Sequence, residues 1–341
     1  MIWLTWRQFR GQAVVAAAAL AALAVVLGVT GPHLAHLYDA SGLATCHARG
    51  SCAALTGSFL NQVKSDSVYP ALYFLGVGVL YVAPATIGMF WGAPLVAREL
   101  EAGTFRLTWN QSVTRVRWLV VKIALVGLAA MATAGLLSLM NTWWASPIIR
   151  AGGFPITLSQ LSRFSPVIFA TSGIAPIGYA AFAFMLGVTA GVLIRRAVPA
   201  MAITLAVFAA LQVLMPLAVR PHLIPPVHAT AAVRASLSDI EMTSGGQLTV
   251  PVDMPGAWVI SNQTITAAGR VFVLPVTPAC QSGTPQACDA FLGRQHLRRR
   301  ITYQPASRYW AFQWYETAIF VALALALAWC CVWWVRHRRL S

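Results

Sequence analysis

Six long apolar runs alternate along the chain with segments in which charged and polar residues gather. Each run holds about the 20 residues that an α-helix needs to cross the hydrocarbon core of a bilayer. The pattern predicts six transmembrane helices, over residues 11–30, 71–96, 118–140, 173–194, 198–219 and 312–335. The second and fourth runs are rich in Gly and Pro. Because small residues let helix backbones approach closely, we expect these two spans to lie inside a helical bundle.

The composition is that of a protein whose surface faces lipid. Of the 341 residues, 58% are hydrophobic and 10% are charged, whereas soluble domains carry about 25% charged residues. The 24 basic and nine acidic residues give a net charge of +15. Because the basic residues lie mainly beside and between the apolar runs, we expect them to contact anionic membrane lipids, and we expect no nucleic acid as a partner.

Basic residues in the short connections give the spans a direction. With six spans they all fall on one side, which the positive-inside rule makes cytoplasmic. They are Arg7, Arg10, Arg98, Arg106, Arg115, Arg117, Lys122, Arg195, Arg196, Arg336, Arg338 and Arg339. Both termini of this multi-pass protein are therefore predicted to lie in the cytoplasm, below the cell membrane.

The first ten residues are predicted to form a separate interfacial element. The apolar run that follows them is longer than the core of a cleaved signal peptide, and five further runs come after it. Residues 1–10 mix Trp3, Trp6 and Phe9 with two arginines. This mixture is typical of an amphipathic elbow helix that lies in the membrane interface.

Three segments are expected on the extracellular side, residues 31–70, 141–172 and 220–311, and only the last is long enough to fold as a domain. In it we predict helices over 228–241 and 284–300 and strands within 247–276. The fold class is thus an all-α polytopic membrane protein with a small α+β insertion between the fifth and sixth helices. Its parts are 1–10, the elbow; 11–219, the first five spans; 220–311, the insertion; and 312–341, the sixth span and a basic tail.

The sequence contains no motif for catalysis or nucleotide binding. The phosphate-binding loop Gly-x-x-x-x-Gly-Lys-Ser/Thr places a lysine in a glycine-rich turn, and the only two lysines, Lys64 and Lys122, lie outside such turns. We therefore expect no catalytic residue, no enzyme activity and no cofactor in this chain. Ionisable residues are also missing from the middle of every apolar run, which disfavours an ion-coupled transporter.

Residues 98–122, between the second and third spans, carry the most informative motif. Arg98-Glu99-Leu100-Glu101-Ala102-Gly103-Thr104 predicts a helix that ends at Gly103, with Glu99 and Glu101 on opposite sides. At helical spacing Arg115, Trp118 and Lys122 share one face and anchor the return into the membrane. Two interpretations are open: a charged elbow on which a cytoplasmic partner pushes, and a solvated loop that obeys the positive-inside rule.

A resemblance to a known family favours the first interpretation. Glu-x-Glu-x-Gly-Thr after the second span, followed by Arg115 and Lys122, resembles the type-2 exporter class of ABC transporter permeases. That class usually has a proline shortly before the arginine, where this chain has Asn110-Gln111-Ser112-Val113-Thr114. The stretches 109–115, 303–310 and 312–317 are similar to an actinobacterial branch of the class.

The resemblance implies the function and the partners. It implies a permease that pairs with a second permease subunit, identical or different, and is energised by separate ABC ATPase subunits that bind ATP and Mg²⁺. The connection between spans two and three would contact the ATPase, so the coupling candidates are Glu99, Glu101, Gly103, Thr104, Arg115 and Lys122. The expected function is that of the permease subunit of an ATP-driven exporter. The alternative is a non-transporting sensor or envelope assembly factor that uses residues 220–311.

Glu316 is an acidic residue near the outer end of the sixth span, among aromatic residues. One interpretation is a hydrated carboxylate at the interface, and the other is a group that pairs with another span or touches the substrate. Arg308 lies about 12 Å away along a straight helix, so it is not a direct partner.

The cysteines outside the membrane are expected to form local disulfides, because that environment is oxidising. The candidates are Cys46 and Cys52 in the first outer segment and Cys280 and Cys288 in the last, although four cysteines allow three connectivities. The mixed His and Cys spacing near the first pair matches no strong zinc pattern, so we expect no metal site.

Overall fold

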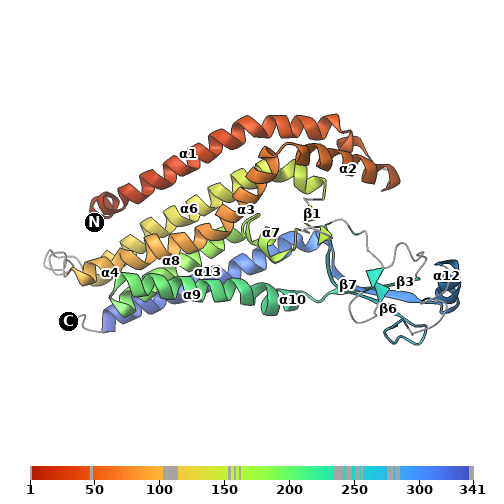
Figure 1. The fold of residues 1–341 in the computed structure, drawn as a ribbon. Helices are drawn as coiled ribbons and strands as arrows, with labels where there is room; N and C mark the ends of the chain where they lie inside the picture. The colour runs from red at the N-terminus through yellow and green to blue at the C-terminus, as the bar shows by residue number, and fades with distance from the viewer. Residues whose placement is uncertain are drawn as a thin grey trace. The chain divides into compact units, whose positions relative to one another are not determined.

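A computed structural model gives the fold of the chain (Figure 1). The structure describes residues 2–46, 49–102, 114–152, 155–156, 159–160, 163–232, 241–242, 248–249, 254, 256–274, 280 and 285–337. It divides into two compact units. The helical unit consists of Met1–Leu161, Ser165–Leu223 and Trp310–Ser341, and the sheet unit consists of Ser162–Phe164 and Ile224–Tyr309.

Six helices are long and apolar enough to cross a membrane. They cover Thr5–Ala40, Val68–Glu101, Arg115–Arg150, Ala175–Ile194, Ala197–Leu223 and Ala306–His337. Each overlaps one of the six predicted runs, so the predicted fold class, with its six spans and small later sheet, is confirmed. Five of these helices are longer than the predicted apolar runs, because they continue past the hydrocarbon-length stretch into polar residues at their ends, whereas the fourth, Ala175–Ile194, begins two residues later than predicted.

The helical unit is built from the following elements. The helices are α1 (Ile2–Ala40), α2 (Arg49–Ser65), α3 (Val68–Ile87), α4 (Ala93–Glu101), α6 (Arg115–Arg150), α7 (Pro166–Ala170), α8 (Ala175–Ile194), α9 (Ala197–Leu214), α10 (Arg220–Leu223) and α13 (Tyr309–His337). Two π-helical segments, η2 (Gly88–Gly92) and η3 (Met215–Val219), join α3 to α4 and α9 to α10. Short strands β1 (Pro155–Ile156) and β2 (Ser159–Gln160) pair between α6 and α7.

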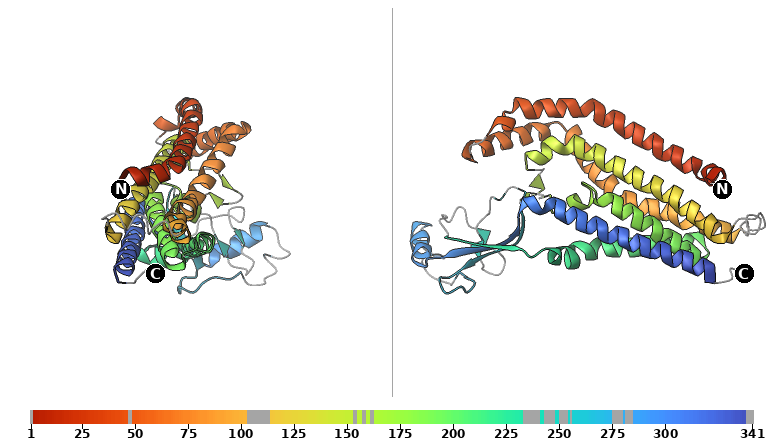
Figure 2. Two further views of the ribbon diagram at one scale, coloured as in Figure 1. Left: turned by 90° about the vertical axis from the view of Figure 1, so that its left-hand side faces the viewer. Right: turned by 180° about the vertical axis from the view of Figure 1, so that it is seen from behind.

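Because the long helices alternate in direction, the helical unit has two ends. The α4 end holds the start of α1, the end of α4, the start of α6, the turn between α8 and α9, and the end of α13. The α10 end holds the end of α1, the starts of α3, α8 and α13, and the end of α10. Figure 2 shows the same helices from two further sides.

Local sequence signals set the helix boundaries at the α4 end. Thr114 caps α6, since its side chain accepts a hydrogen bond from the backbone N–H of Arg117 at 3.3 Å. The helix α8 ends where Arg195 adopts a left-handed conformation with φ of 60°. The next helix begins two residues later, at Ala197, so α8 and α9 form a tight helical hairpin.

The helix α8 is the centre of the bundle. Of the most apolar 18-residue stretch of α8, 78% is buried, whereas the corresponding share is 50% for the α3–α4 span and 6% for α1. The backbones of α8 and the α3–α4 span touch through glycines: a Cβ added to Gly88 would lie 2.6 Å from the carbonyl oxygen of Ala183, and one added to Gly187 would lie 2.7 Å from the nitrogen of Ala93. The expectation that the second and fourth spans lie inside the bundle is confirmed.

The long helix α1 packs on the rest of the unit mainly near its ends. Near its start the ring of Phe9 meets Trp91 edge-on, with ring centroids 4.9 Å apart. Near its other end Trp144 Nε1 on α6 donates to Thr30 Oγ1 at 2.9 Å. Residues 2–10 continue into the first span as one helix, and the interfacial position of that segment stays a prediction.

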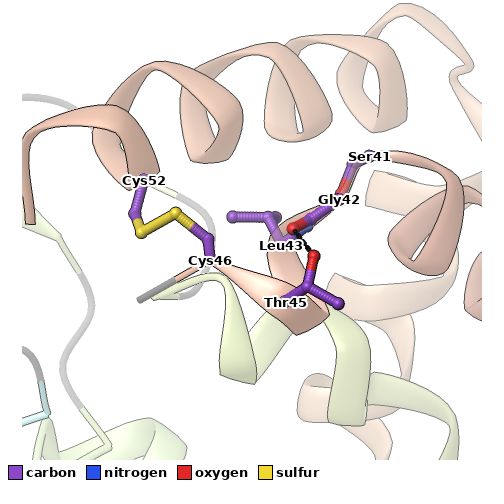
Figure 3. The surroundings of a disulfide bond; sticks show 6 residues. All are labelled: Ser41, Gly42, Leu43, Thr45, Cys46 and Cys52. Atoms are coloured by element: carbon purple, nitrogen blue, oxygen red, sulfur yellow. Dashed lines mark hydrogen bonds between the residues drawn. A yellow bond between two sulfur atoms is a disulfide. The ribbon is translucent and has the colours of Figure 1, made fainter. Parts of the chain in front are cut away.

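A disulfide closes the connection that follows α1. Cys46 is bonded to Cys52, which joins the turn after η1 (Leu43–Thr45) to α2, as Figure 3 shows. Beside it, Thr45 Oγ1 donates to the carbonyl oxygen of Gly42 at 3.1 Å. The helix α2 then contributes Phe59 to a buried cluster with residues of α1, α3 and α6.

The sheet unit contains a three-stranded antiparallel sheet of order β3-β7-β6. Its strands are β3 (Val227–Ala232), β7 (Arg298–Gln304) and β6 (Trp258–Ile265), and the unit also contains the pair β4 (Glu241–Met242) and β5 (Leu248–Thr249), the helix α12 (Pro285–Arg294) and the 3₁₀ turn η5 (Ala306–Arg308). The β6–β7 register shifts by one residue between Val259 and Ser261.

Two of the predicted elements of this unit differ from the structure. Residues 228–232, the start of the helix predicted over 228–241, belong to β3, because pairing with β7 outweighs the helix preference of three alanines. Residues 233–240 of that predicted helix lie outside the described residues. The predicted helix over 284–300 is α12 only as far as Arg294, and its last three residues begin β7.

Candidate functional site

A polar cluster at the α4 end connects the end of α4 to α1 and α6. The Oε1 atom of Glu99 accepts hydrogen bonds from Lys122 Nζ at 2.5 Å and from Gln8 Nε2 at 2.8 Å. Lys122 is only 2% exposed, and its ammonium group lies 4.8 Å from the ring centre of Trp118. The carboxylate therefore neutralises a cation that its surroundings otherwise shield from water.

The second carboxylate of the motif contacts a different helix. Glu101 Oε1 accepts a hydrogen bond from the backbone N–H of Ala197, the first residue of α9, at 3.2 Å. A negative group is favourable there because the start of a helix carries unpaired N–H groups and partial positive charge. Glu99 and Glu101 thus connect the end of α4 to three other helices, α1, α6 and α9.

Of the remaining coupling candidates, the structure describes Arg115. Arg115 is exposed as the first residue of α6, and it lies on the helix that presents Lys122 seven residues later. Gly103 and Thr104 lie outside the described residues, as does the departure from the family pattern at 110–113. The structure therefore brings together Glu99 and Lys122, and brings Glu101 of α4 into contact with the first residue of α9.

A second charged cluster is completely buried near the α10 end. Arg220 and Glu316 form a two-point ion pair, with Nε to Oε2 at 2.9 Å and Nη2 to Oε1 at 3.0 Å. Tyr179 on α8 donates its hydroxyl to Oε1 of the same carboxylate. The guanidinium group also lies over the ring of Phe169 on α7, 4.0 Å from its centre. The exposed fraction of Arg220, Tyr179 and Glu316 is at most 1%.

The structure decides between the two interpretations of Glu316. It pairs with another span and is not a hydrated carboxylate of the interface. Arg308, which sequence spacing rules out as its partner, instead donates to the carbonyl oxygen of Pro225 at 2.7 Å and to Gln304 Oε1 at 2.9 Å, within the sheet unit. One feature of the sequence pointed to the true partner, Arg220. This residue directly follows the fifth apolar run, at the end that lies on the same side of the membrane as Glu316 in the sixth run.

An amide side chain holds the neighbouring turn against α13. Gln313 Oε1 accepts hydrogen bonds from the backbone N–H groups of Ile174 at 3.1 Å and Ala175 at 2.9 Å, and its Nε2 donates to the carbonyl oxygen of Phe169 at 3.2 Å. These bonds satisfy the first backbone donors of α8. The turn that carries Phe169 and the start of α8 is therefore fixed to the helix that carries Glu316.

Four of the six cysteines form two disulfides, one in each unit. Cys280 is bonded to Cys288 in the sheet unit, as Cys46 is to Cys52 in the helical unit. Cys331 lies on α13 next to Thr189 of α8, with sulfur and oxygen 3.2 Å apart, which makes it a packing residue between two helices. Among the described residues, no three His, Cys, Asp or Glu side chains are grouped so that they would hold a metal ion.

One comparison with known proteins identifies the family. The profile of the family described as "ABC-2 membrane transporter related" matches residues 17–220, from the middle of the first span to Arg220 itself. Comparisons with curated proteins and with solved structures gave no match. Because the match covers more than half of the chain and agrees with six membrane-spanning helices, the protein belongs to the ABC-2 membrane transporter related family.

Proposed function

We propose that this multi-pass membrane permease component of an ABC transporter is the membrane half of an ATP-driven exporter. In this proposal ATP and Mg²⁺ bind to a separate ABC ATPase subunit, and the chain pairs with a second permease subunit. Family membership supports the permease role. The absence of a phosphate-binding loop from the 341-residue sequence supports a separate ATPase.

The observation that carries the proposal is the connectivity of α4 at its charged end. A force applied to residues 98–122 acts on a segment that is hydrogen bonded to α1 through Gln8, to α6 through Lys122 and to the α8–α9 hairpin through the N–H of Ala197. Since a hydrogen bond to an ionised carboxylate is stronger than one between neutral groups, these contacts can transmit a displacement of α4 to three helices at once.

The distribution of basic residues supports an ATPase on this side. Exposed basic side chains gather at the α4 end: Arg7, Arg10, Arg98, Arg115, Arg117, Arg195, Arg196 and Arg336. By the positive-inside rule this end is cytoplasmic, where ATP is available, and both termini lie there. In this proposal the membrane is the cell membrane, and the segment between the fifth and sixth spans is extracellular.

The mechanism that we propose is mechanical. Closure of two ATPase subunits around ATP pushes on residues 98–122, and the α4 end moves together with the starts of α6 and α9. Because α8 packs backbone-to-backbone against the α3–α4 span, the movement reorients the centre of the bundle instead of one surface helix.

The test is purification of the tagged full chain from its native membranes, followed by identification of any bound P-loop ATPase and measurement of its ATP hydrolysis. Charge reversal of exposed residues at the α4 end, Glu101→Lys and Arg115→Glu, should lower ATPase recovery at least tenfold. Charge reversal at the α10 end, Asp39→Lys and Lys64→Glu, is the matched control, since both residues are also exposed, and should leave recovery unchanged. Stable purification of the wild type without an ATPase would count against the exporter. Equal recovery with all four variants would overturn the coupling assignment.

A further inference from the structure

The buried ion pair joins the two places where the chain leaves and re-enters the helical unit. Arg220 lies four residues before the sheet unit begins at Ile224, and Glu316 lies seven residues after it ends at Tyr309. On the other side of these connections, β3 pairs with β7, and Gln304 Nε2 donates to the carbonyl oxygen of Ile224 at 2.7 Å. The pair therefore clamps α10 and α13 together, and the hydroxyl of Tyr179 brings α8 into the same contact.

Stability alone does not account for this cluster. Replacing a buried ion pair by apolar residues of similar volume is often neutral or stabilising, because removing two charges from water costs about as much as their attraction returns. Ionisable groups inside the spans of transport proteins generally mark pathways for substrates or ions. A charged cluster that connects three helices of a permease is therefore a candidate for a contact that breaks and reforms during transport.

A buried amide side chain on the same membrane span provides a second, independent observation. Gln212 on α9 is only 8% exposed, and its Nε2 atom has no hydrogen-bond partner among the described residues. An unpaired amide in an apolar bundle is costly, unless the group meets water or a polar ligand in another state of the protein. Gln212 and Arg220 are separated by eight residues.

The π-helical segment η3 places these two residues on the same side. An ordinary turn takes about 3.6 residues and a turn closed by i to i+5 bonds takes about one more, so eight residues complete about two turns. Burial agrees: Gln212, Met215 and Arg220 are buried, while Val213, Leu214, Leu217 and Ala218 between them are exposed. Arg220 is thus aligned with Gln212 on the inner face of the span.

We propose that the Arg220–Glu316–Tyr179 cluster is a latch that closes the α10 end of the transport path, and that Gln212 lines the path behind it. In the closed state described here Glu316 neutralises Arg220. In the open state α10 separates from α13, water or a polar group of the substrate replaces the carboxylate, and Gln212 gains a partner. This inference rests on the proposed function, because the exporter cycle supplies the force that opens the latch.

The experiment measures the access of water to Gln212. In a Cys330→Ser/Cys331→Ser background, Gln212→Cys is exposed to a membrane-impermeant maleimide added from the α10 side of membranes that contain the full complex. Labelling should be slow at rest and at least tenfold faster when ATP is turned over. Ala200→Cys is the matched control, since Ala200 is fully buried on the same helix near the α4 end. It should stay protected throughout.

A second arm tests the latch without ATP. Glu316→Gln should make Gln212→Cys reactive at rest, because Arg220 keeps its charge and then requires water. The charge exchange Arg220→Glu/Glu316→Arg should restore protection. If Glu316→Gln also exposes Ala200→Cys, the variant has unfolded. Tyr179→Phe, which keeps the ion pair, is then used instead, and it should increase the labelling rate of Gln212→Cys a few-fold.

The outcomes separate the two proposals. Protection of Gln212→Cys in a folded Glu316→Gln or Tyr179→Phe variant would overturn the latch. So would unchanged labelling in a complex that hydrolyses ATP, and either result leaves the exporter proposal intact. If Gln212→Cys reacts in the resting variants but the protein recruits no ATPase, the latch is supported and the exporter proposal is overturned.

Discussion

Neutralising one partner of the Arg220–Glu316 pair should destabilise the protein far more than replacing both. In Arg220→Met the carboxylate of Glu316, which is 0% exposed, loses its cation and stays in the bundle. Two unit charges about 4 Å apart attract by about 4 kcal/mol at an effective dielectric constant of about 20. Breaking a buried pair by removing one partner typically costs about 3–5 kcal/mol. We therefore expect Arg220→Met to lower the free energy of unfolding by about 4 kcal/mol, or roughly a thousandfold in the equilibrium constant.

The double variant Arg220→Met/Glu316→Leu removes both charges and keeps the volume. It should lie within about 1 kcal/mol of the wild type or be more stable, since no unpaired charge remains. The costs of the two single variants therefore should not add, and the double variant should be several kcal/mol more stable than the sum of those costs predicts.

The assay is unfolding of the purified full chain in mixed micelles by increasing SDS, followed by far-ultraviolet circular dichroism. Tyr179→Phe is the control, because it removes one hydrogen bond and keeps both charges, with an expected cost of about 1 kcal/mol. Additive costs in the double variant would refute the argument, because they would mean that the two side chains stabilise the bundle independently of each other's charge.

Three further predictions follow from packing and covalent structure. Gly187→Ala should destabilise the bundle by about 2 kcal/mol in the same SDS assay, because its Cβ would lie 2.7 Å from the nitrogen of Ala93, whereas Gly78→Ala, with open space around it, should change stability by less than about 1 kcal/mol. Trp144→Phe should cost about 0.5–1.5 kcal/mol through the lost bond to α1, and an unchanged midpoint would exclude that bond. Mass spectrometry after alkylation of the SDS-unfolded, unreduced chain should find modification at Cys330 and Cys331, and modification of any of the other four cysteines would contradict the two disulfides.

The six spans were accessible from the sequence because hydropathy over about 20 residues reports directly on a helix that crosses a bilayer. The opposite directions of Glu99 and Glu101 also followed from helical geometry alone, and the two carboxylates contact different helices. Local geometry did not reveal their partners, since a lysine 23 positions later and a backbone N–H 96 positions later become neighbours only through packing.

The sequence was least informative where pairing overrides local preference. Arg220 and Glu316 are 96 positions apart, and each alone looks like a charged residue at the edge of an apolar run. The alanine-rich segment that forms β3 has the composition of a helix, and its strand conformation depends on β7, which lies more than 60 positions later. A π-helical segment such as η3 leaves no compositional trace, although it decides which side of the helix Arg220 occupies.

The helices α1 and α8 should differ strongly in their tolerance to amino-acid substitution. Side chains of α1 are mostly exposed on the bundle, with 6% of its most apolar stretch buried, so one apolar residue there should substitute for another with little penalty. In α8, with 78% buried, glycines touch neighbouring backbones, so most single substitutions require a compensating change on another helix. A saturation mutagenesis map of the chain would therefore show a permissive first helix and an intolerant fourth span. The substitutions that rescue defects in α8 would lie on the α3–α4 span.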